Sequence, residues 1–171
     1  MSDADTTRAL LVDSFERVRE LVTTVAADVD EHTATFQVDP GANTPAWLLW
    51  HLSRVQDDHV ADLAGVAQAW EEWRERFDLP FDADATGYGQ GLDDVLAVRT
   101  DGALLADYHQ AVHELTLRYL DTLTVAELER VVDERWDPPV TASARLVSVL
   151  GDVLQHLGQA SFALGAASRS T

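Results

Sequence analysis

The chain has 171 residues, 46% of them hydrophobic, which suits a single folded domain over residues 1–171 and argues against a disordered chain. Arginine and lysine number 12 against 30 aspartates and glutamates, and the net charge of −18 argues against binding to nucleic acid or to an anionic membrane surface. The absence of cysteine excludes a disulfide framework, a thiolate metal site and a cysteine nucleophile.

The N-terminal region shows no targeting segment. It lacks the basic stretch and the continuous apolar core of a signal peptide. No apolar run anywhere in the chain approaches the roughly 20 residues that a membrane span needs. We therefore expect a soluble, cytoplasmic protein.

Two amphipathic helices are predicted in the first part of the chain. Over residues 4–28, apolar side chains recur at alternating spacings of four and three, as on one face of a helix. These side chains are Leu11, Phe15, Val18, Val22 and Val25. A polar break follows, and Thr44 with Pro45 then opens a helix to about Ala64, because threonine is a good N-cap and proline suits the first helical position.

The middle of the chain is predicted to hold a long loop between shorter helices. Residues 65–77 favour a helix or a continuation of the preceding one, and residues 92–100 favour a short helix. The loop between them, residues 78–91, carries glycines at alternate positions: Gly87, Gly89 and Gly91. They superficially resemble a phosphate-binding loop, but no strand precedes them and no lysine follows, so we assign them to turns.

The last part of the chain predicts two further long helices. Asp101 caps one that runs to about Leu120, and Thr141 caps a final one to about Leu164. A capping box over residues 124–127 opens a short helix between them. Residues 133–140 are predicted to be a loop, and strand signals are weak throughout. Four long helices with a long crossover region indicate an all-α protein, a four-helix bundle.

Two polar residues lie beside the apolar face of the final helix. Asp152 and His156 are four positions apart, so they stack on one side of the helix, with Arg145 and Gln159 on the same margin. A carboxylate and an imidazole at this spacing can close on one metal ion. The same spacing also occurs in ordinary helix ion pairs, so it leaves both interpretations open.

The second long helix supplies a third inward polar side chain. The stretch WLLWHLSRVQDDH places His51 among apolar residues, with Asp58 on the same side and His59 nearer the centre of the apolar face. We predict that one divalent metal ion is held by His51, Asp152 and His156. Zinc is our first choice, with nickel and manganese as alternatives. The residues expected to line the same cavity are Arg54, Asp58, His59, Arg145 and Gln159.

A rival pair of histidines has the same helical spacing. His109 and His113 are four apart, which is nominally a better metal signal than an acid with a histidine. They lie about 100° and 140° around the helix from Tyr108, near the centre of the apolar stripe. We therefore interpret them as solvated surface residues.

The helix opening TPAWLLWHL and the last helix reading VLGDVLQHLGQA resemble the DinB-like superfamily of metal-binding four-helix bundles. The stretches HLSRVQDDHVAD and ERWDPPV are similar to those of an actinobacterial subgroup, and the resemblance covers nearly the whole chain. The superfamily includes mycothiol-dependent maleylpyruvate isomerases and related thiol transferases. The resemblance implies metal ligands at His51, Asp152 and His156, with aspartate standing where the isomerase has glutamate. It also implies a homodimer, because many relatives are dimers.

Two functions remain open. The first is a metal-dependent S-transferase or isomerase that uses a low-molecular-weight thiol such as mycothiol as cosubstrate. Since the chain has no cysteine, the sulfur must come from a small molecule. Arg54, Arg135 or Arg145 would bind a carboxylate of that thiol or of the acceptor. The alternative is a non-enzymatic bundle that binds a metal or small ligand, in a stress-related role. A bundle that has kept the fold without its metal is a third interpretation.

Overall fold

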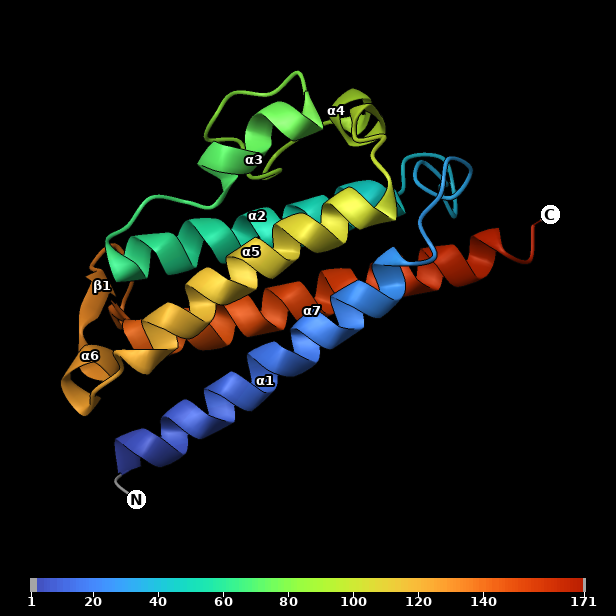
Figure 1. Ribbon diagram of the computed structural model, residues 1–171. Coiled ribbons are helices and arrows are strands. Elements are labelled where there is room, and N and C mark those ends of the chain that lie inside the picture. The colour runs from blue at the N-terminus through green and yellow to red at the C-terminus, as the bar shows by residue number, and fades with distance from the viewer. Residues whose placement is uncertain (1–2, 171) are drawn as a thin grey trace.

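The computed structural model describes residues 3–170 and shows a bundle of four long helices (Figure 1). They are α1 (Asp3–Ala26), α2 (Pro45–Ala64), α5 (Gly102–Asp121) and α7 (Ala142–Ala167). The all-α four-helix bundle predicted from the sequence is therefore confirmed. No helix among the described residues is both long and apolar enough to cross a membrane.

Five short elements lie in the connections of the described chain. They are α3 (Trp70–Phe77), α4 (Leu92–Ala97), α6 (Val125–Glu129), β1 (Val131–Asp133) and β2 (Val140–Thr141). In Figure 1, α3 and α4 lie together above the bundle as parts of the α2–α5 crossover, and α6 and β1 lie at one end of it. The two strands pair antiparallel, with Val131 opposite Thr141. They flank the loop predicted at 133–140 and are too short to give a recognisable alternating pattern.

Side-chain caps begin three of the long helices where the sequence predicts them. Each cap oxygen accepts a hydrogen bond from the backbone N–H three residues on, which would otherwise lack a partner. The pairs are Thr44 with Trp47 at 3.4 Å, Asp101 with Leu104 at 2.9 Å, and Thr141 with Ala144 at 3.3 Å. The local sequence thus determines where these helices start.

Gly65 ends α2 and prevents the predicted continuation into residues 65–77. Its φ of 65° is left-handed, and its N–H bonds the carbonyls of Ala61 and Asp62. Glycine adopts this conformation without the steric cost that other residues meet. The next helix, α3, therefore begins only at Trp70.

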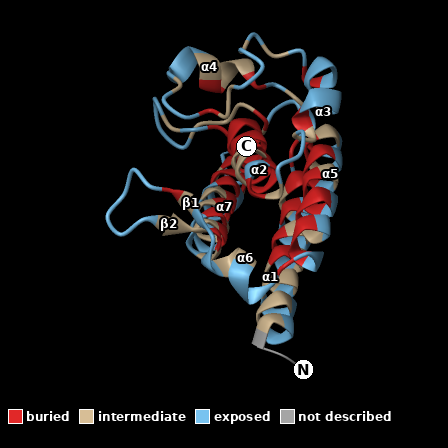
Figure 2. Ribbon diagram, turned by 90° about the vertical axis from the view of Figure 1, so that its left-hand side faces the viewer, coloured by how far each residue is buried: buried red, intermediate tan, exposed pale blue. Residues whose placement is uncertain are grey.

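The helix α5 is buried on two sides, because it packs against both α1 and α2. Figure 2 shows the buried residues gathered on the inward faces of the bundle. The buried arc of α5 includes His109 and His113, whose exposed fractions are 1% and 2%. The prediction that they are solvated surface residues was wrong, because it assumed one narrow stripe centred on Tyr108.

Candidate metal centre

Three metal-ligating side chains meet where α2 packs against α7. His51, Asp152 and His156 each place one ligand atom within 4.8 Å of the other two, and no other group of three does so within residues 3–170. The rings of His51 and His156 have centroids 4.7 Å apart. His156 Nε2 lies 3.6 Å from Asp152 Oδ1. These three groups are close enough to reach a shared ion.

A backbone carbonyl determines the tautomer of His51. Nδ1 lies 2.6 Å from the carbonyl oxygen of Thr86, which can only accept, so Nδ1 donates and Nε2 keeps its lone pair. Trp47 stacks on the imidazole with centroids 4.6 Å apart. Burial lowers the pKa of His51, although the bond to Thr86 opposes this effect. The imidazole is therefore held neutral, with Nε2 available to bind.

Gly87 packs directly against His51. A Cβ at this position would lie 2.6 Å from His51 Nδ1 and 3.1 Å from carbons of Trp47 and Trp50. The φ of +97° is also one that L side chains rarely adopt. Only glycine fits here, so one of the glycines that we assigned to turns also shapes the surroundings of His51.

His156 and Asp152 complete the donor set on α7. Nδ1 of His156 donates to Oε1 of Gln159 at 2.9 Å, which leaves Nε2 free. Oδ2 of Asp152 is buried and has no hydrogen-bond partner among the described residues. A buried carboxylate oxygen without a donor is costly unless a cation binds it. Two imidazoles and this carboxylate therefore fit a divalent metal ion.

A pocket of about 600 Å³ lies beside the three residues. His51 and Asp152 line it, together with Asp58 and His59 from α2. Burial lowers the pKa of His59, and the charge of Arg145 acts in the same direction. The pocket thus has a second imidazole that favours its neutral form near the candidate ligands.

An adjoining pocket of about 430 Å³ shares Asp58 and His59 and extends toward the β-hairpin. Both of its arginines contact Asp133: Arg135 donates twice, at 2.9 and 2.8 Å, and Arg145 lies 3.5 Å away. Arg135 holds the pKa of Asp133 well below its usual range. Arg145, which we predicted to line the cavity, thus lines this adjoining pocket.

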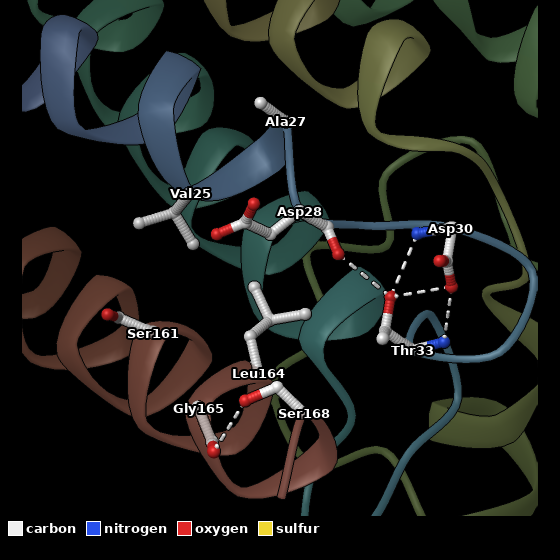
Figure 3. Close-up of a pocket in the computed structure, with 9 residues that line it drawn as sticks. All are labelled: Val25, Ala27, Asp28, Asp30, Thr33, Ser161, Leu164, Gly165 and Ser168. Carbon is white, nitrogen blue, oxygen red and sulfur yellow. Dashed lines mark hydrogen bonds between the residues drawn. The ribbon is translucent and has the colours of Figure 1, made fainter. Parts of the chain in front are cut away.

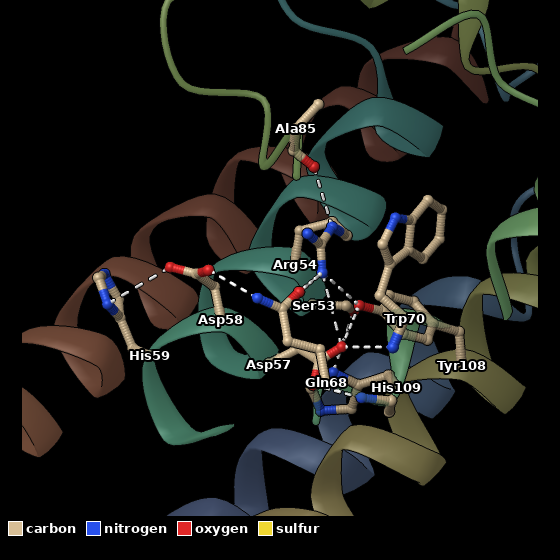
Figure 4. A network of polar contacts seen from close by, with 11 residues as sticks. Ser53, Arg54, Asp57, Asp58, His59, Gln68, Trp70, Ala85, Tyr108 and His109 are labelled. Carbon is tan, nitrogen blue, oxygen red and sulfur yellow. Dashed lines mark hydrogen bonds and ion pairs between the residues drawn. The ribbon is translucent and has the colours of Figure 1, made fainter. Parts of the chain in front are cut away.

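Arg54 lies outside both pockets, beneath the crossover, and is fully buried (Figure 4). Nε donates to the carbonyl of Ala85 at 3.0 Å and Nη1 to Oε1 of Gln68 at 2.8 Å. The guanidinium lies 4.9 Å from the ring centre of Trp70. The sequence placed Arg54 in the metal cavity, but its position on α2 directs it toward α3, where no substrate carboxylate can reach it.

Asp57 completes this buried network. It accepts from the backbone N–H groups of Ala69 and Trp70 at 2.9 and 2.8 Å and from the hydroxyl of Tyr108 at 2.8 Å (Figure 4). Burial raises the pKa of Asp57, and these donors oppose the increase. Ala69, the N-cap residue of α3, makes no side-chain cap bond. Asp57 therefore caps α3 from a different helix.

Sequence reasoning missed the contributions of Thr86 and Gln68. Thr86 acts through its carbonyl, which every residue type has, so its identity carries no signal. Gln68 accepts from Arg54 and donates to Asp58 at 2.8 Å, which links the buried network to the metal-side pocket. The sequence signal for this network is the presence of Arg54 and Asp57 three apart on a largely buried helix, a spacing that places them on one side of it.

The histidines of α5 form a different environment. Nδ1 of His109 lies 3.1 Å from the hydroxyl of Ser53, and Nε2 of His113 lies 3.3 Å from Oε1 of Glu16. Burial lowers the pKa of His109 to about 3. Within the described chain, no third ligand completes a metal-spaced group with this pair. His109 and His113 are therefore buried core residues.

A third cavity, of about 550 Å³, lies between the C-terminal ends of α1 and α7 (Figure 3). Its lining includes Asp28, Asp30 and Thr33 from the turn after α1, and Leu164 from α7. The hydroxyl of Thr33 bonds the carbonyl of Asp28 and the carboxylate of Asp30. No histidine lines this cavity, so it offers no comparable set of ligands.

The described residues form a bundle of four long helices, with His51, Asp152 and His156 placed between two of them so that they could hold a metal ion. A model of the DinB superfamily matches residues 14–160, so the chain belongs to the DinB superfamily. Among solved structures, it is similar to one described as "Crystal structure of the conserved protein of locus from Enterococcus faecalis", with 28% identity, a TM-score of 0.85 and coverage of 97% of both chains. A search of curated proteins gave no significant match.

Proposed function

We propose that the protein binds one divalent metal ion through Nε2 of His51, Nε2 of His156 and the carboxylate of Asp152. The observation that carries this proposal is the state of the three groups: each imidazole donates its Nδ1 proton to an oxygen, and Asp152 keeps a buried oxygen without a donor. Metal-bound imidazoles in proteins have this arrangement. Membership in a superfamily that often binds metals supports the same proposal.

Zinc is the metal that we propose first. Two imidazoles and a carboxylate are typical zinc ligands, and a site with three protein ligands keeps a position open for water or substrate, as catalytic zinc sites do. Nickel and manganese accept the same donors. The remaining position would face the pocket that His51 and Asp152 line.

The reaction that we propose is transfer or isomerisation that uses a low-molecular-weight thiol, such as mycothiol, in the reducing cytoplasm. A bound divalent metal lowers the pKa of a thiol and so supplies thiolate at neutral pH. The sulfur must come from a cosubstrate, because the chain has no cysteine. In this reaction His59 would accept the thiol proton, a role supported by its position in the pocket lining and by burial, which lowers its pKa.

Elemental analysis of the purified protein tests the metal proposal. We expect about one divalent ion per chain in the native protein and none in Asp152→Asn, which removes the anionic ligand but keeps the side-chain shape. Asp58→Asn is the matched control, since Asp58 lines the pocket outside the cluster. Unchanged metal content in Asp152→Asn would exclude this donor set.

The thiol proposal needs a separate assay. Conjugation of a generic electrophile would be followed with mycothiol and with other cellular thiols, for the metal-loaded native protein and for His51→Ala. We expect the rate to be higher for the native protein. Equal rates for the two proteins would rule out thiol transfer and leave metal binding untouched.

A non-enzymatic metal or small-ligand binding role is the second candidate. Arg135 and Arg145 both contact Asp133, so neither arginine of these two pockets is unpaired for a substrate carboxylate. That pairing favours binding without turnover. A thermal shift with small ligands, without accelerated conjugation, would support this role, in which the protein senses or stores the ligand under stress.

We also propose that the protein is a homodimer that pairs through the outer face of α7. Val147, Leu154 and Phe162 are exposed there by 66%, 48% and 64%. Arg145 and Asp152 are the only charged residues in the α7 sequence, so two copies of net charge −18 would repel each other least along this face. Light scattering should give a dimer for the native protein and a monomer for Leu154→Glu. A native monomer would contradict the proposal.

A further inference from the structure

Three donors along one face of α2 hold residues 85–90 against that helix. Positions 47, 51 and 54 are separated by four and three, so their side chains lie on the same face. Each donor has its own acceptor in the segment: Trp47 Nε1 bonds Gln90 Oε1 at 2.8 Å, His51 Nδ1 bonds the Thr86 carbonyl at 2.6 Å, and Arg54 Nε bonds the Ala85 carbonyl at 3.0 Å. The contact to the metal ligand His51 is the middle one of the three.

The segment has little structure of its own. Residues 85–90 belong to no helix or strand, and the backbone hydrogen bond within the segment joins Gln90 N–H to the Gly87 carbonyl at 3.3 Å. Gly87 and Gly89 both have positive φ angles, of 97° and 74°. Because the segment forms no ladder or helix, its position depends on the donors from α2.

Arg54, one of the three donors to residues 85–90, is itself fixed by several contacts. Its guanidinium is fully buried and bonds Gln68 at 2.8 Å, and it lies 3.6 Å from the carboxylate of Asp57. Asp57 in turn receives the N–H groups at the start of α3 and the hydroxyl of Tyr108 on α5. Arg54 therefore fixes the segment relative to α3 and α5 as well as to α2.

We propose that Arg54 and Gln90 are positioning residues for the metal ligand His51: together with Trp47, they anchor residues 85–90 so that the Thr86 carbonyl fixes the imidazole in its Nε2-binding tautomer. The effect on metal affinity rests on the proposed function. Neither Arg54 nor Gln90 lines the pocket beside the cluster, so both act through the segment. Loss of partners that orient a metal-bound imidazole weakens metal affinity by about 10- to 100-fold.

Two variants release the anchors, and a third serves as control. Gln90→Leu removes the acceptor of Trp47 at a half-buried position. Arg54→Lys keeps a positive charge opposite Asp57 but removes the Nε donor to Ala85. Tyr108→Phe is the matched control, because it perturbs the same buried network without a contact to residues 85–90.

Two measurements are made on each protein that retains a native circular dichroism spectrum. Chelator competition gives the zinc affinity, and nitrogen-15 NMR of the metal-free protein gives the tautomer of His51. We expect Gln90→Leu and Arg54→Lys to weaken zinc binding by about tenfold and to reduce the fraction of His51 with its proton on Nδ1. Tyr108→Phe should change neither quantity.

The NMR measurement keeps the inference separate from the metal proposal. If the native protein binds no zinc, the proposed function fails, but the tautomer in the metal-free variants still decides whether the segment positions His51. A native-like tautomer in both anchor variants would overturn the inference. So would an equal loss in Tyr108→Phe, because the effect would then come from the core in general.

Discussion

Two pairs of histidines lie in this bundle, and only one of them is arranged like a metal site. His51 and His156 come from different helices, yet both have Nδ1 bonded to an oxygen, and both have a ligand atom within 4.8 Å of one from Asp152. His109 and His113 come from one helix at the favourable spacing of four, but they are buried in the core. The spacing of two histidines along a helix is therefore a weaker sign of a metal site than the hydrogen bond that Nδ1 makes and the presence of a nearby carboxylate.

The two pairs also differ in access. The 600 Å³ pocket is lined by His51 and Asp152, whereas His109 and His113 are 1% and 2% exposed. A ligand can reach His51 and Asp152 through this pocket. Protonation or metal entry at His109 would instead require the core to open. The first pair is thus suited to exchange with solvent and the second to packing.

The largest expected effect on zinc affinity comes from replacing His156, and the comparison is with the replacement of His113. His156→Ala should reduce zinc affinity by more than the roughly 100-fold that the loss of an orienting partner causes, because it removes a ligand. His113→Ala should leave zinc affinity unchanged and lower the free energy of unfolding instead. Isothermal titration calorimetry and urea unfolding of both variants measure the two quantities. If zinc affinity fell in His113→Ala and not in His156→Ala, the metal would be bound by the α5 pair instead.

Acidification should destabilise the metal-free protein through His109. Burial lowers its pKa from 6.5 to about 3, so the unfolded chain takes up a proton below pH 6.5 while the folded protein does not. The stability present above pH 6.5 is therefore lost as the pH falls, by about 2 kcal/mol between about pH 7 and about pH 5. Urea unfolding at both pH values should show a smaller loss in His109→Gln. If the free energy of unfolding fell equally with pH in both proteins, His109 would not be the cause of the loss.

A methyl group at Gly87 should disturb His51 and leave the second pair unaffected. The Cβ of Gly87→Ala would lie 2.6 Å from His51 Nδ1, so the ring or the loop must move, and we expect zinc affinity to fall by about tenfold. Gly89→Ala is the control, since its φ is also positive but no atom lies within 4 Å of the new Cβ. Chelator competition distinguishes them. Equal losses would point to backbone strain instead of contact with His51.

The smallest effect is expected at Gln159, the partner of His156. Gln159→Leu removes the acceptor at 2.9 Å from Nδ1, but the side chain is exposed and water can replace it. We expect zinc affinity to fall by about tenfold at most. The same competition assay measures it. A larger loss than in Gly87→Ala would mean that the α7 side of the cluster is the more strictly oriented one.

Most of the fold follows from local sequence signals. The caps at Thr44, Asp101 and Thr141 and the apolar stripes predict the starts and inward faces of three long helices. The prediction that His109 and His113 are solvated was wrong for a physical reason. A helix that packs against two neighbours buries a wider part of its circumference than a single apolar stripe covers. Which helices contact two neighbours depends on the tertiary arrangement, which no local pattern contains.

The candidate site was predictable to a lesser degree. Helical geometry explains why Asp152 and His156 lie on one side of α7, and the apolar surroundings of His51 explain why it faces inward. The carbonyl of Thr86 and the space at Gly87 were not predictable, because they depend on how a loop about 35 residues away folds back on α2. Arg54 was misplaced for a related reason, since its acceptors lie in the turn just before α3 and in this loop.

The cap that Asp57 provides for α3 has a consequence for the order of folding. A helix of eight residues is too short to be stable alone, and the start of α3 depends on a carboxylate that faces it only after α2 has formed. The crossover should therefore acquire its structure after the four-helix core, and it should also be the first part to open. Amide hydrogen exchange would then report at least two cooperative units, with residues 69–77 exchanging before those of α2 and α5.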